Sequence, residues 1–499
     1  MSEADVRQLP PPPAADQKPP GGQPSDGLNP RRWWALPVAL TATFLSLFDL
    51  FVVNVAAPSV ERELHTNAAA IQLIIAGYSF TYAIGLITAG RLGDIFGPRA
   101  MFLTGMAVFT AASFVCGIAP TALVLILARL AQGLGASIMV PQVLALIQVL
   151  FPLPERPRAF AFFGATAGLG SIAGQVLGGV LLVANLFDLS WRPVFLIQLP
   201  IGLASIIAGA VLLPRPAAKA AGAPARIGSR IDPAGTVLFT VALGAVLLPL
   251  IVGRESDWPL WSIVCLIASV PLFVLFAVQQ RARVGGGAVP LIAPGLFRDR
   301  AFTLGLLINL AFYANLASFF LVVTLFLQNG LGMSALRAGL TFGWLGVGFV
   351  IGSFFLARRL AAKYGQRLLV LGVALVVVTL AAGIALVAVK GTDINTFEFA
   401  PVMFFVGLGN GLVLPTVLNV VLAGVSKELA GSASGVLVTM QQVGSALGIA
   451  AVGSLFFARL GDGGAYRSAT VAGLVADGLL VVLVWVLIGV LTRTRAQKT

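Results

Sequence analysis

Two oppositely charged residues lie deep inside long apolar stretches of the sequence. Asp49 falls near the middle of the stretch 35–60, and Arg129 falls within the stretch 121–149. Charged side chains at such depth usually face a cavity and serve a function. Burial disfavours the charged form of an acid and a nearby cation favours it, so an acid that meets two environments in turn can load and release a proton. Asp49 is therefore predicted to couple to protons, with a purely structural carboxylate as the alternative.

Arg129 requires a partner, because an unpaired guanidinium in apolar surroundings is very costly. Gln132 follows at i+3 and shares its helix face. The sequence leaves open whether Asp49, backbone carbonyls or water pairs with Arg129, and whether the arginine is only structural. Asp477, in the apolar stretch 469–491, is a second deeply placed acid and a further predicted proton-coupling residue.

Uncharged polar and aromatic side chains recur at similar depth in the apolar stretches. Amide and aromatic faces suit hydrophobic substrates, and aromatic rings also attract cations. Each side chain could instead serve helix packing. The predicted substrate-binding set is Tyr78, Tyr82, Asn54, Gln132, Asn309, Tyr313 and Gln441.

Glycines are concentrated in the fifth apolar stretch, 158–183. Gly174 and Gly178 are four residues apart, with Gly179 adjacent. Small residues at this spacing let two helices approach closely. We interpret them either as static packing or as a sliding contact between two helical bundles.

A short polar loop separates the second and third apolar stretches. It combines an acid and two arginines with glycines, which permit the positive φ of a tight turn. Its residues of interest are Gly90, Arg91, Asp94, Gly97 and Arg99. A plain turn that carries basic residues is one explanation.

The elements that position these residues are predicted from composition. Hydrophobic residues make up 58% of the 499 residues and charged residues only 10%, and the mean hydropathy is +0.97. A soluble domain carries about 25% charged residues, so most of this surface must contact lipid. The net charge of +13 does not indicate nucleic-acid binding, because the basic residues punctuate apolar stretches and form no stripe. Cys116 and Cys265 lie singly, and no metal or cofactor site is predicted.

Fourteen apolar segments are near the ~20 residues that span a bilayer. Only helices satisfy their own backbone hydrogen bonds there, so an all-α integral membrane protein is expected. The predicted spans are 35–60, 70–90, 99–119, 121–149, 158–183, 192–213, 232–252, 259–280, 301–327, 336–357, 367–389, 398–424, 432–457 and 469–491.

The distribution of basic residues predicts the orientation. With both termini in the cytoplasm, most of the 32 Lys and Arg residues fall on the cytoplasmic side, as the positive-inside rule requires. Residues 1–30 are rich in proline and polar residues and are expected to be a disordered cytoplasmic tail. We expect a multi-pass protein of the inner (plasma) membrane.

An internal repeat divides the chain. The loop 89–99 aligns with 357–367, and the two copies follow the second and tenth spans. Two six-helix bundles with two inserted helices are therefore expected, an architecture of many transporters. The predicted domains are the 1–30 tail, a first bundle at 31–214, a linker with two extra helices at 215–300, a second bundle at 301–491 and a 492–499 tail.

Several motifs occur in order on successive spans. They are the loop 90–99, the first-span segment 47–58, the fourth-span segment 129–136, the segment 191–202 and the fifth-span segment 174–179, which has Gln175 where proline is usual. With these motifs the chain resembles the fourteen-span drug:proton antiporters of the major facilitator superfamily, over essentially everything after Arg31.

The resemblance implies a non-enzymatic multidrug efflux protein. Such a protein exports hydrophobic or cationic drugs by alternating access in exchange for protons, which gives antibiotic resistance, and we expect it to work as a monomer in the lipid bilayer. It also implies that Arg129 takes part in proton coupling and that the loop around Asp94 is a conformational latch. The alternatives are export of an endogenous lipid or natural product and, in another class, a passive channel or scaffold. No Gly-x-x-x-x-Gly-Lys phosphate loop is present, so ATP-driven pumping by this chain alone is excluded.

Overall fold

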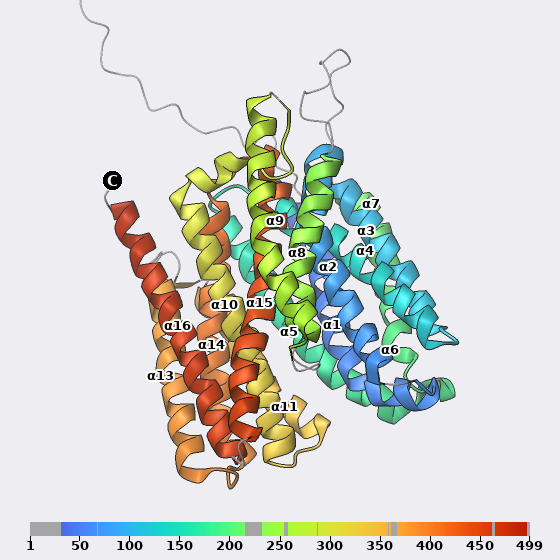
Figure 1. The fold of residues 1–499 in the computed structure, drawn as a ribbon, viewed down its shortest axis with the longest axis vertical. Helices are drawn as coiled ribbons and strands as arrows, with labels where there is room; N and C mark the ends of the chain where they lie inside the picture. Colours follow the sequence, from blue (N-terminus) through green and yellow to red (C-terminus); the bar gives the residue numbers. More distant parts are fainter. Residues whose placement is uncertain are drawn as a thin grey trace, which may run out of the picture.

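The computed structural model is helical throughout the part of the chain it describes. It describes residues 31–66, 68–214, 232–253, 258–286, 288–357, 359–360, 367–461 and 465–496, and these contain no strand. Within those ranges, fourteen helices are long and apolar enough to cross a membrane. The predicted all-helical, fourteen-span fold is therefore confirmed, and Figure 1 shows the helices running side by side.

The first half of the chain packs mainly on itself. Helix α1 packs against α5, and α4 packs against both α2 and α3. Gly97, with φ of 90°, makes the sharp turn between α2 and α3. The predicted sixth span is broken at Ile197 into a short α6 and a longer α7. The helices are α1 (Arg32–Glu63), α2 (Ala68–Phe96), α3 (Pro98–Gly117), α4 (Ala122–Leu150), α5 (Arg156–Ala184), α6 (Pro193–Leu196) and α7 (Gln198–Leu212), with a 3-10 turn η1 (Leu186–Asp188).

Two further helices form a hairpin between the halves. They are α8 (Pro233–Val252) and α9 (Leu260–Gly285). Asp232 caps α8 by accepting a hydrogen bond from the Gly235 amide at 2.9 Å. Helix α8 contacts α2 from the first half and α15 from the second, and the hairpin lies in front of these helices in Figure 1.

In the second half, α10 packs against α15 and α16, and α14 packs against α11 and α13. Two of its spans end in π-helical turns, η4 and η5. The elements are α10 (Arg300–Leu325), η4 (Phe326–Gly330), α11 (Ala335–Val350), η5 (Ile351–Leu356), α13 (Arg367–Lys390), α14 (Thr396–Leu422), α15 (Ala430–Gly461) and α16 (Tyr466–Ala496), with 3-10 turns η3 (Pro294–Arg298) and η6 (Lys427–Leu429).

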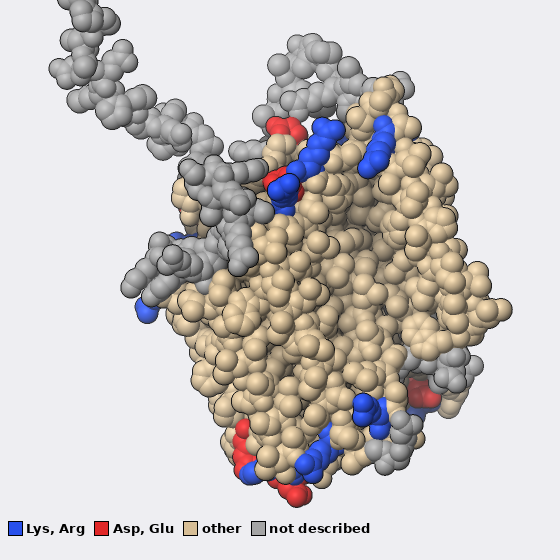
Figure 2. Space-filling model, turned by 60° about the vertical axis from the view of Figure 1, so that its left-hand side comes forward, with Lys and Arg blue, Asp and Glu red and all other residues tan. Residues whose placement is uncertain are grey.

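The surface has the distribution expected of a protein in lipid. Figure 2 shows charged residues near the two ends of the molecule and a wide band without them between. Apolar side chains such as Val264, Ile267 and Val270 on α9 are more than half exposed. Exposing so many apolar side chains to water would be unfavourable, whereas contact with lipid hydrocarbon is favourable. The chain is a multi-pass membrane protein.

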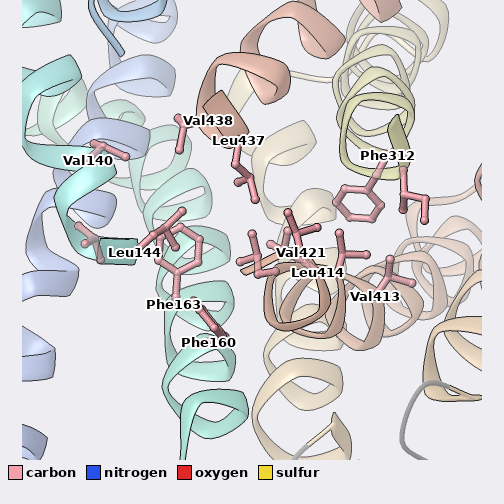
Figure 3. Packing of buried hydrophobic residues seen from close by; sticks show 14 of the residues in the cluster. Val140, Leu144, Phe160, Phe163, Phe312, Val413, Leu414, Val421, Leu437 and Val438 are labelled. Atoms are coloured by element: carbon pink, nitrogen blue, oxygen red, sulfur yellow. The ribbon is translucent and has the colours of Figure 1, made fainter. Parts of the chain in front are cut away.

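Apolar side chains fill the space between the halves near one end. We call this end the amino-terminal face, because α1 begins and α16 ends there. Figure 3 shows these side chains facing one another across the two halves, and all are buried. We call them the apolar plug: Val140, Leu144, Phe160 and Phe163 from the first half, and Leu414, Val421, Leu437 and Val438 from the second.

Some predictions fall on residues outside the described ranges. These include the 1–30 tail, residues 215–231, 254–257 and 287 of the predicted linker, most of the second loop copy, at 358 and 361–366, and residues 497–499 of the predicted final tail. Residues 492–496 of that tail belong to α16. The domain boundaries at 214 and 301 stay predictions.

Candidate functional site

Asp49 and Arg129 form an ion pair in the interior of the first half. Asp49 lies on α1 and Arg129 on α4, and the Oδ2 atom of the carboxylate bonds the Nη1 atom of the guanidinium. Both side chains are fully buried. The partner of Arg129, which the sequence left open, is therefore Asp49.

Two glutamines complete the surroundings of the carboxylate. The Nε2 atoms of Gln132 and Gln198 donate to Asp49 Oδ1 at 2.9 and 3.0 Å. Arg129 also donates to the Ile74 carbonyl at 3.0 Å and to the side-chain oxygen of Gln132 at 2.7 Å. A buried pair is tolerated when further hydrogen bonds satisfy its other atoms. Here they come from Gln132 on α4 itself and from two other helices, α2 and α7, while Arg129 Nη2 has no hydrogen-bond partner among the described residues. We call Asp49, Arg129, Gln132 and Gln198 the ion-pair cluster.

Aromatic rings surround the guanidinium. The Arg129 Cζ atom lies 4.6 Å from the Tyr78 ring centroid and 5.8 Å from that of Phe195, and cations are attracted to such faces. The Tyr78 hydroxyl donates to the Ser46 carbonyl on α1 at 3.1 Å. Tyr78, predicted as a substrate contact, thus lies against the ion pair, as does Gln132.

Asp477 occupies a different environment in the second half. It lies on α16, is fully buried, and bonds the Ser318 hydroxyl of α10 through Oδ1. The Asn315 side chain donates to the Asp477 backbone carbonyl at 3.2 Å. Among the described residues, Asp477 Oδ2 has no hydrogen-bond partner. A cavity of about 10 Å³ is lined by Asn315, Asn410 and Val481, the last of these one helical turn from Asp477, and a space of this size holds about one water molecule.

Of the other predicted substrate residues, Tyr82 lies on α2 in the first half, and Asn309, Tyr313 and Gln441 lie on α10 and α15 in the second half. Tyr82 stacks on Tyr78 with ring centroids 6.0 Å apart, and it lies close enough to Tyr313 of α10 to interact electrostatically. Gln441 of α15 donates to Asn309 of α10 at 3.4 Å. By contrast, the remaining member of the predicted set, Asn54, is exposed and donates to the Leu50 carbonyl of its own helix at 2.9 Å.

Asp94 joins the two halves at the amino-terminal face. It accepts hydrogen bonds from the amides of Gly431 and Ser432, at 2.7 and 2.9 Å, and from the Ser432 hydroxyl. These groups form the first turn of α15, where free amides and the helix dipole favour a negative charge. Arg91 lies 3.9 Å from the same carboxylate. Arg99 binds within its own half, donating to the Ala210 carbonyl at 2.7 Å.

Some of the predicted glycines lie at a contact between the two halves, and others pack within one half. A Cβ atom added to Gly90 would lie 3.1 Å from Cα of Gly435 on α15, so these residues are a close contact between halves. Gly174 and Gly178 instead face α1 in their own half, which places them in static packing and not in a contact between bundles. Gly179 has no atom within 4 Å of an added Cβ.

Sequence reasoning missed several members of these sites. Gln198 could have been found as an amide within the quoted segment 191–202. Ser46 and Ser318 carry no comparable signal, because hydroxyls in spans commonly bond their own backbone. Within the described residues, no group of three or more His, Cys, Asp or Glu side chains could hold a metal ion.

The sequence matches a known protein family. A sequence profile described as the Major Facilitator Superfamily matches residues 39–449. The chain is 38% identical to the "Probable actinorhodin transporter" of Streptomyces coelicolor, covering 88% of this chain and 76% of that protein. It is 35% identical to the "Puromycin resistance protein pur8" of Streptomyces alboniger, covering 94% and 93%. It is 33% identical to the "Cephamycin export protein CmcT" of Amycolatopsis lactamdurans, covering 83% of each.

A solved structure shares the fold. The chain matches the human organic anion transporter MFSD10 (TETRAN) with a TM-score of 0.64 over 92% of this chain and 100% of that one. The sequence identity is 15%, so this likeness concerns the fold alone.

Proposed function

Since this chain belongs to the Major Facilitator Superfamily, in its group of antibiotic and multidrug exporters, we propose that it is a proton-coupled antiporter of the inner (plasma) membrane. It exchanges protons for small hydrophobic or cationic antibiotic-like molecules. The chain is a transporter and not an enzyme. The use of protons, the nature of the cargo and the orientation of the chain in the membrane are parts of this proposal.

The buried ion-pair cluster is the observation that supports this proposal. The pair of Asp49 and Arg129 is electrically neutral as it stands. Protonating Asp49 would leave the cation of Arg129 without a counter-charge in a water-poor interior, a costly state. The protein can relieve this cost by changing shape so that water or another group reaches Arg129. Binding one proton therefore favours a second conformation.

A short path of rings leads from this cluster to the boundary between halves. Arg129 lies over Tyr78, Tyr78 stacks on Tyr82, and Tyr82 lies near Tyr313. We assign cargo binding to Tyr82, Tyr313, Asn309 and Gln441. A shift of the guanidinium would move the ring that supports Tyr82, so proton and cargo would influence each other's affinity, as reciprocal coupling requires.

The contacts of Asp94 and of the apolar plug characterise the conformation of this structure. Both hold the halves together at the amino-terminal face. Basic residues favour this face as the cytoplasmic one, so the proposed state is closed to the cytoplasm. In this proposal Asp94 is a latch and Gly90 and Gly435 are the contact that separates when the latch opens.

One proton per cargo molecule is sufficient for useful export. One pH unit is worth about 1.4 kcal/mol, and 100 mV adds about 2.3 kcal/mol per charge. For an uncharged cargo these forces add to roughly 3.7 kcal/mol and sustain a gradient of several hundred-fold, at tenfold per ~1.4 kcal/mol. Exchange of one proton for one monovalent cation moves no net charge, so the pH gradient alone then sustains about a tenfold gradient per pH unit.

The names of the relatives indicate which classes of cargo to consider. They refer to actinorhodin, puromycin and cephamycin, so a natural product made by the cell itself is as well supported as a foreign drug. Both would use the same mechanism. A screen of toxic compounds and secreted products in cells with and without the gene separates these cargo classes.

The proposal is tested in everted vesicles that carry an imposed pH gradient and a fluorescent pH dye. Puromycin and ethidium are the probes. We expect the wild-type chain to release protons when a transported probe is added and Asp49→Asn to abolish that release, because an amide cannot take up the proton. Asp188→Asn, at an exposed acid, is the matched control and should behave as wild type. Full probe-driven proton release by Asp49→Asn would remove Asp49 from the mechanism.

A further inference from the structure

A groove lies between α1 and α5 near the amino-terminal face, apart from the ion-pair cluster and the proposed cargo residues. Its volume is about 280 Å³. Pro37 on its wall is exposed, so the groove opens at the molecular surface. Its lining is Trp33, Leu36, Pro37, Leu40, Thr41, Phe44, Phe162 and Thr166.

The groove has the dimensions of one lipid chain in one leaflet. Its α1 wall runs from Trp33 to Phe44, roughly 16 Å at a rise of 1.5 Å per residue. Half of a hydrocarbon core about 30 Å thick is ~15 Å. The volume of about 280 Å³ lies at the lower edge of the roughly 300–1,000 Å³ of sites for drug-sized ligands. The length of the α1 wall therefore favours a single flexible chain over a polycyclic molecule.

The polar atom of Thr41 is already engaged. Its hydroxyl donates to the Val38 carbonyl at 2.6 Å and accepts a hydrogen bond from Ser205 at 2.8 Å. The neighbouring wall is aromatic, since Phe162 packs against Trp33 and against Phe354 of the second half, with centroids 6.2 and 4.8 Å apart. The groove therefore presents mainly apolar contacts to its occupant, with the Thr166 hydroxyl and the Trp33 indole N–H as its other polar groups.

The mouth of the groove is positively charged. The Arg158 guanidinium lies 4.4 Å from the Trp33 ring centroid, and Arg158 is exposed. Arg32 donates two hydrogen bonds to Glu155, at 2.9 and 2.8 Å, which neutralises that one nearby acid. Arginines at a membrane surface attract anionic headgroups, at about 1 kcal/mol per residue.

We propose that this groove binds one anionic phospholipid of the leaflet on the amino-terminal face. One acyl chain lies along α1 between Trp33 and Phe44, and the phosphate lies beside Arg158. Because Phe162 contacts both the groove and Phe354 of the second half, the lipid stabilises the conformation in which the two halves meet at this face.

The experiment is a titration of the full-length purified chain, delipidated in detergent and followed by native mass spectrometry. The probes are phosphatidylglycerol and phosphatidylcholine with identical chains. We expect preferential retention of phosphatidylglycerol. Arg158→Ala should weaken that lipid roughly five-fold, the effect of losing one surface arginine, and leave phosphatidylcholine unchanged. Arg281→Ala, at an exposed arginine of α9 outside the groove, is the matched control.

A second variant tests the groove itself. Thr166→Phe should fill it and remove one bound lipid of either kind, while size-exclusion behaviour reports that the protein is folded. Should this variant not fold, glycerol phosphate is added to the wild type, and it should fail to displace phosphatidylglycerol because it lacks a chain. Equal retention of both lipids, displacement by glycerol phosphate, or displacement by puromycin overturns the proposal, the last by assigning the groove to cargo.

Discussion

The two buried acids of this protein lie in opposite kinds of surroundings. Asp49 in the first half has a guanidinium and two amide donors on its carboxylate. Asp477 in the second half has the Ser318 hydroxyl, and no salt bridge to it occurs among the described residues. An isolated carboxylate in an apolar interior is stable only as the neutral acid. We therefore expect Asp49 to be charged and Asp477 to carry a proton in the same conformation.

The comparison shows that depth in the membrane does not define a role. Both acids lie well inside their spans, yet among the described residues only Asp49 has a counter-ion. A charged pair can respond to a proton by separating, whereas a neutral acid must first lose its proton to a newly admitted group. Asp49 is thus the stronger candidate for the coupling step and Asp477 for a secondary site.

The largest effect is expected from Arg129→Ala. It leaves the Asp49 carboxylate buried without its cation, which should lower the free energy of unfolding by about 3–5 kcal/mol and uncouple transport. Thermal unfolding in detergent measures the first effect and the vesicle assay the second. The double variant Asp49→Asn with Arg129→Gln removes both charges and should recover most of the stability. A single variant as stable as wild type would contradict the charged state of Asp49.

Asp477→Asn should have a much smaller effect on stability. The amide has nearly the shape of the neutral acid, so we expect the free energy of unfolding to change by less than about 1.5 kcal/mol, the contribution of one ordinary hydrogen bond. Asp49→Asn measured alongside should cost more, because it leaves Arg129 unpaired. Equal losses in the two variants would mean that Asp477 is ionised and paired with a cation, as Asp49 is, and the contrast between the two acids would be wrong.

Ser318→Ala sharpens the description of the second site. It removes one hydrogen bond to Asp477 and should lower the free energy of unfolding by about 0.5–1.5 kcal/mol. Combined with Asp477→Asn in a double-mutant cycle, it reports the interaction between the two side chains. A coupling of several kcal/mol would indicate a charged acceptor and would not agree with a protonated acid.

The smallest effect is expected at a partly exposed ion pair, Arg32 and Glu155, which serves as a reference for the buried acids. The hydrogen bond from Arg32 lowers the pKa of Glu155. The pair therefore stabilises the fold above the unfolded pKa of about 4.3, and this contribution is lost as the pH falls through the lower folded pKa. Because both side chains are partly exposed, Glu155→Gln should cost under about 1 kcal/mol. The difference in melting temperature between this variant and the wild type should shrink as the pH is lowered from 5 to 3. A difference that does not change with pH would show that the ion pair is not its cause.

The fold was largely predictable because lipid imposes a simple rule. Long apolar runs must be helices, and the fourteen spans follow from that rule alone. Asp49 and Arg129 were recognisable for the same reason, since charges are rare at such depth. The break at Ile197 was not, because a short interruption leaves the hydropathy unchanged.

Pairing between helices was the part that the sequence could not supply. Gln132 and Tyr78 were predicted to line a cavity, yet they lie against the ion pair, because helix rotation decides which polar side chains meet. Gly174 and Gly178 have the same spacing as glycines at the boundary between halves, but they face α1. Spacing gives the face of a helix and not the identity of its neighbour.

The π-helical turn η5 has a mechanical consequence for the span that contains it. It carries Phe354, which touches Phe162 across the boundary between halves. A π turn holds one residue more than an α turn, so tightening it to α would rotate the segment on one side by about 100° relative to the other. Phe354 would then point elsewhere and its neighbour would take its place. A change of winding within a single turn could exchange the partners at this contact while the rest of the helix stays in place.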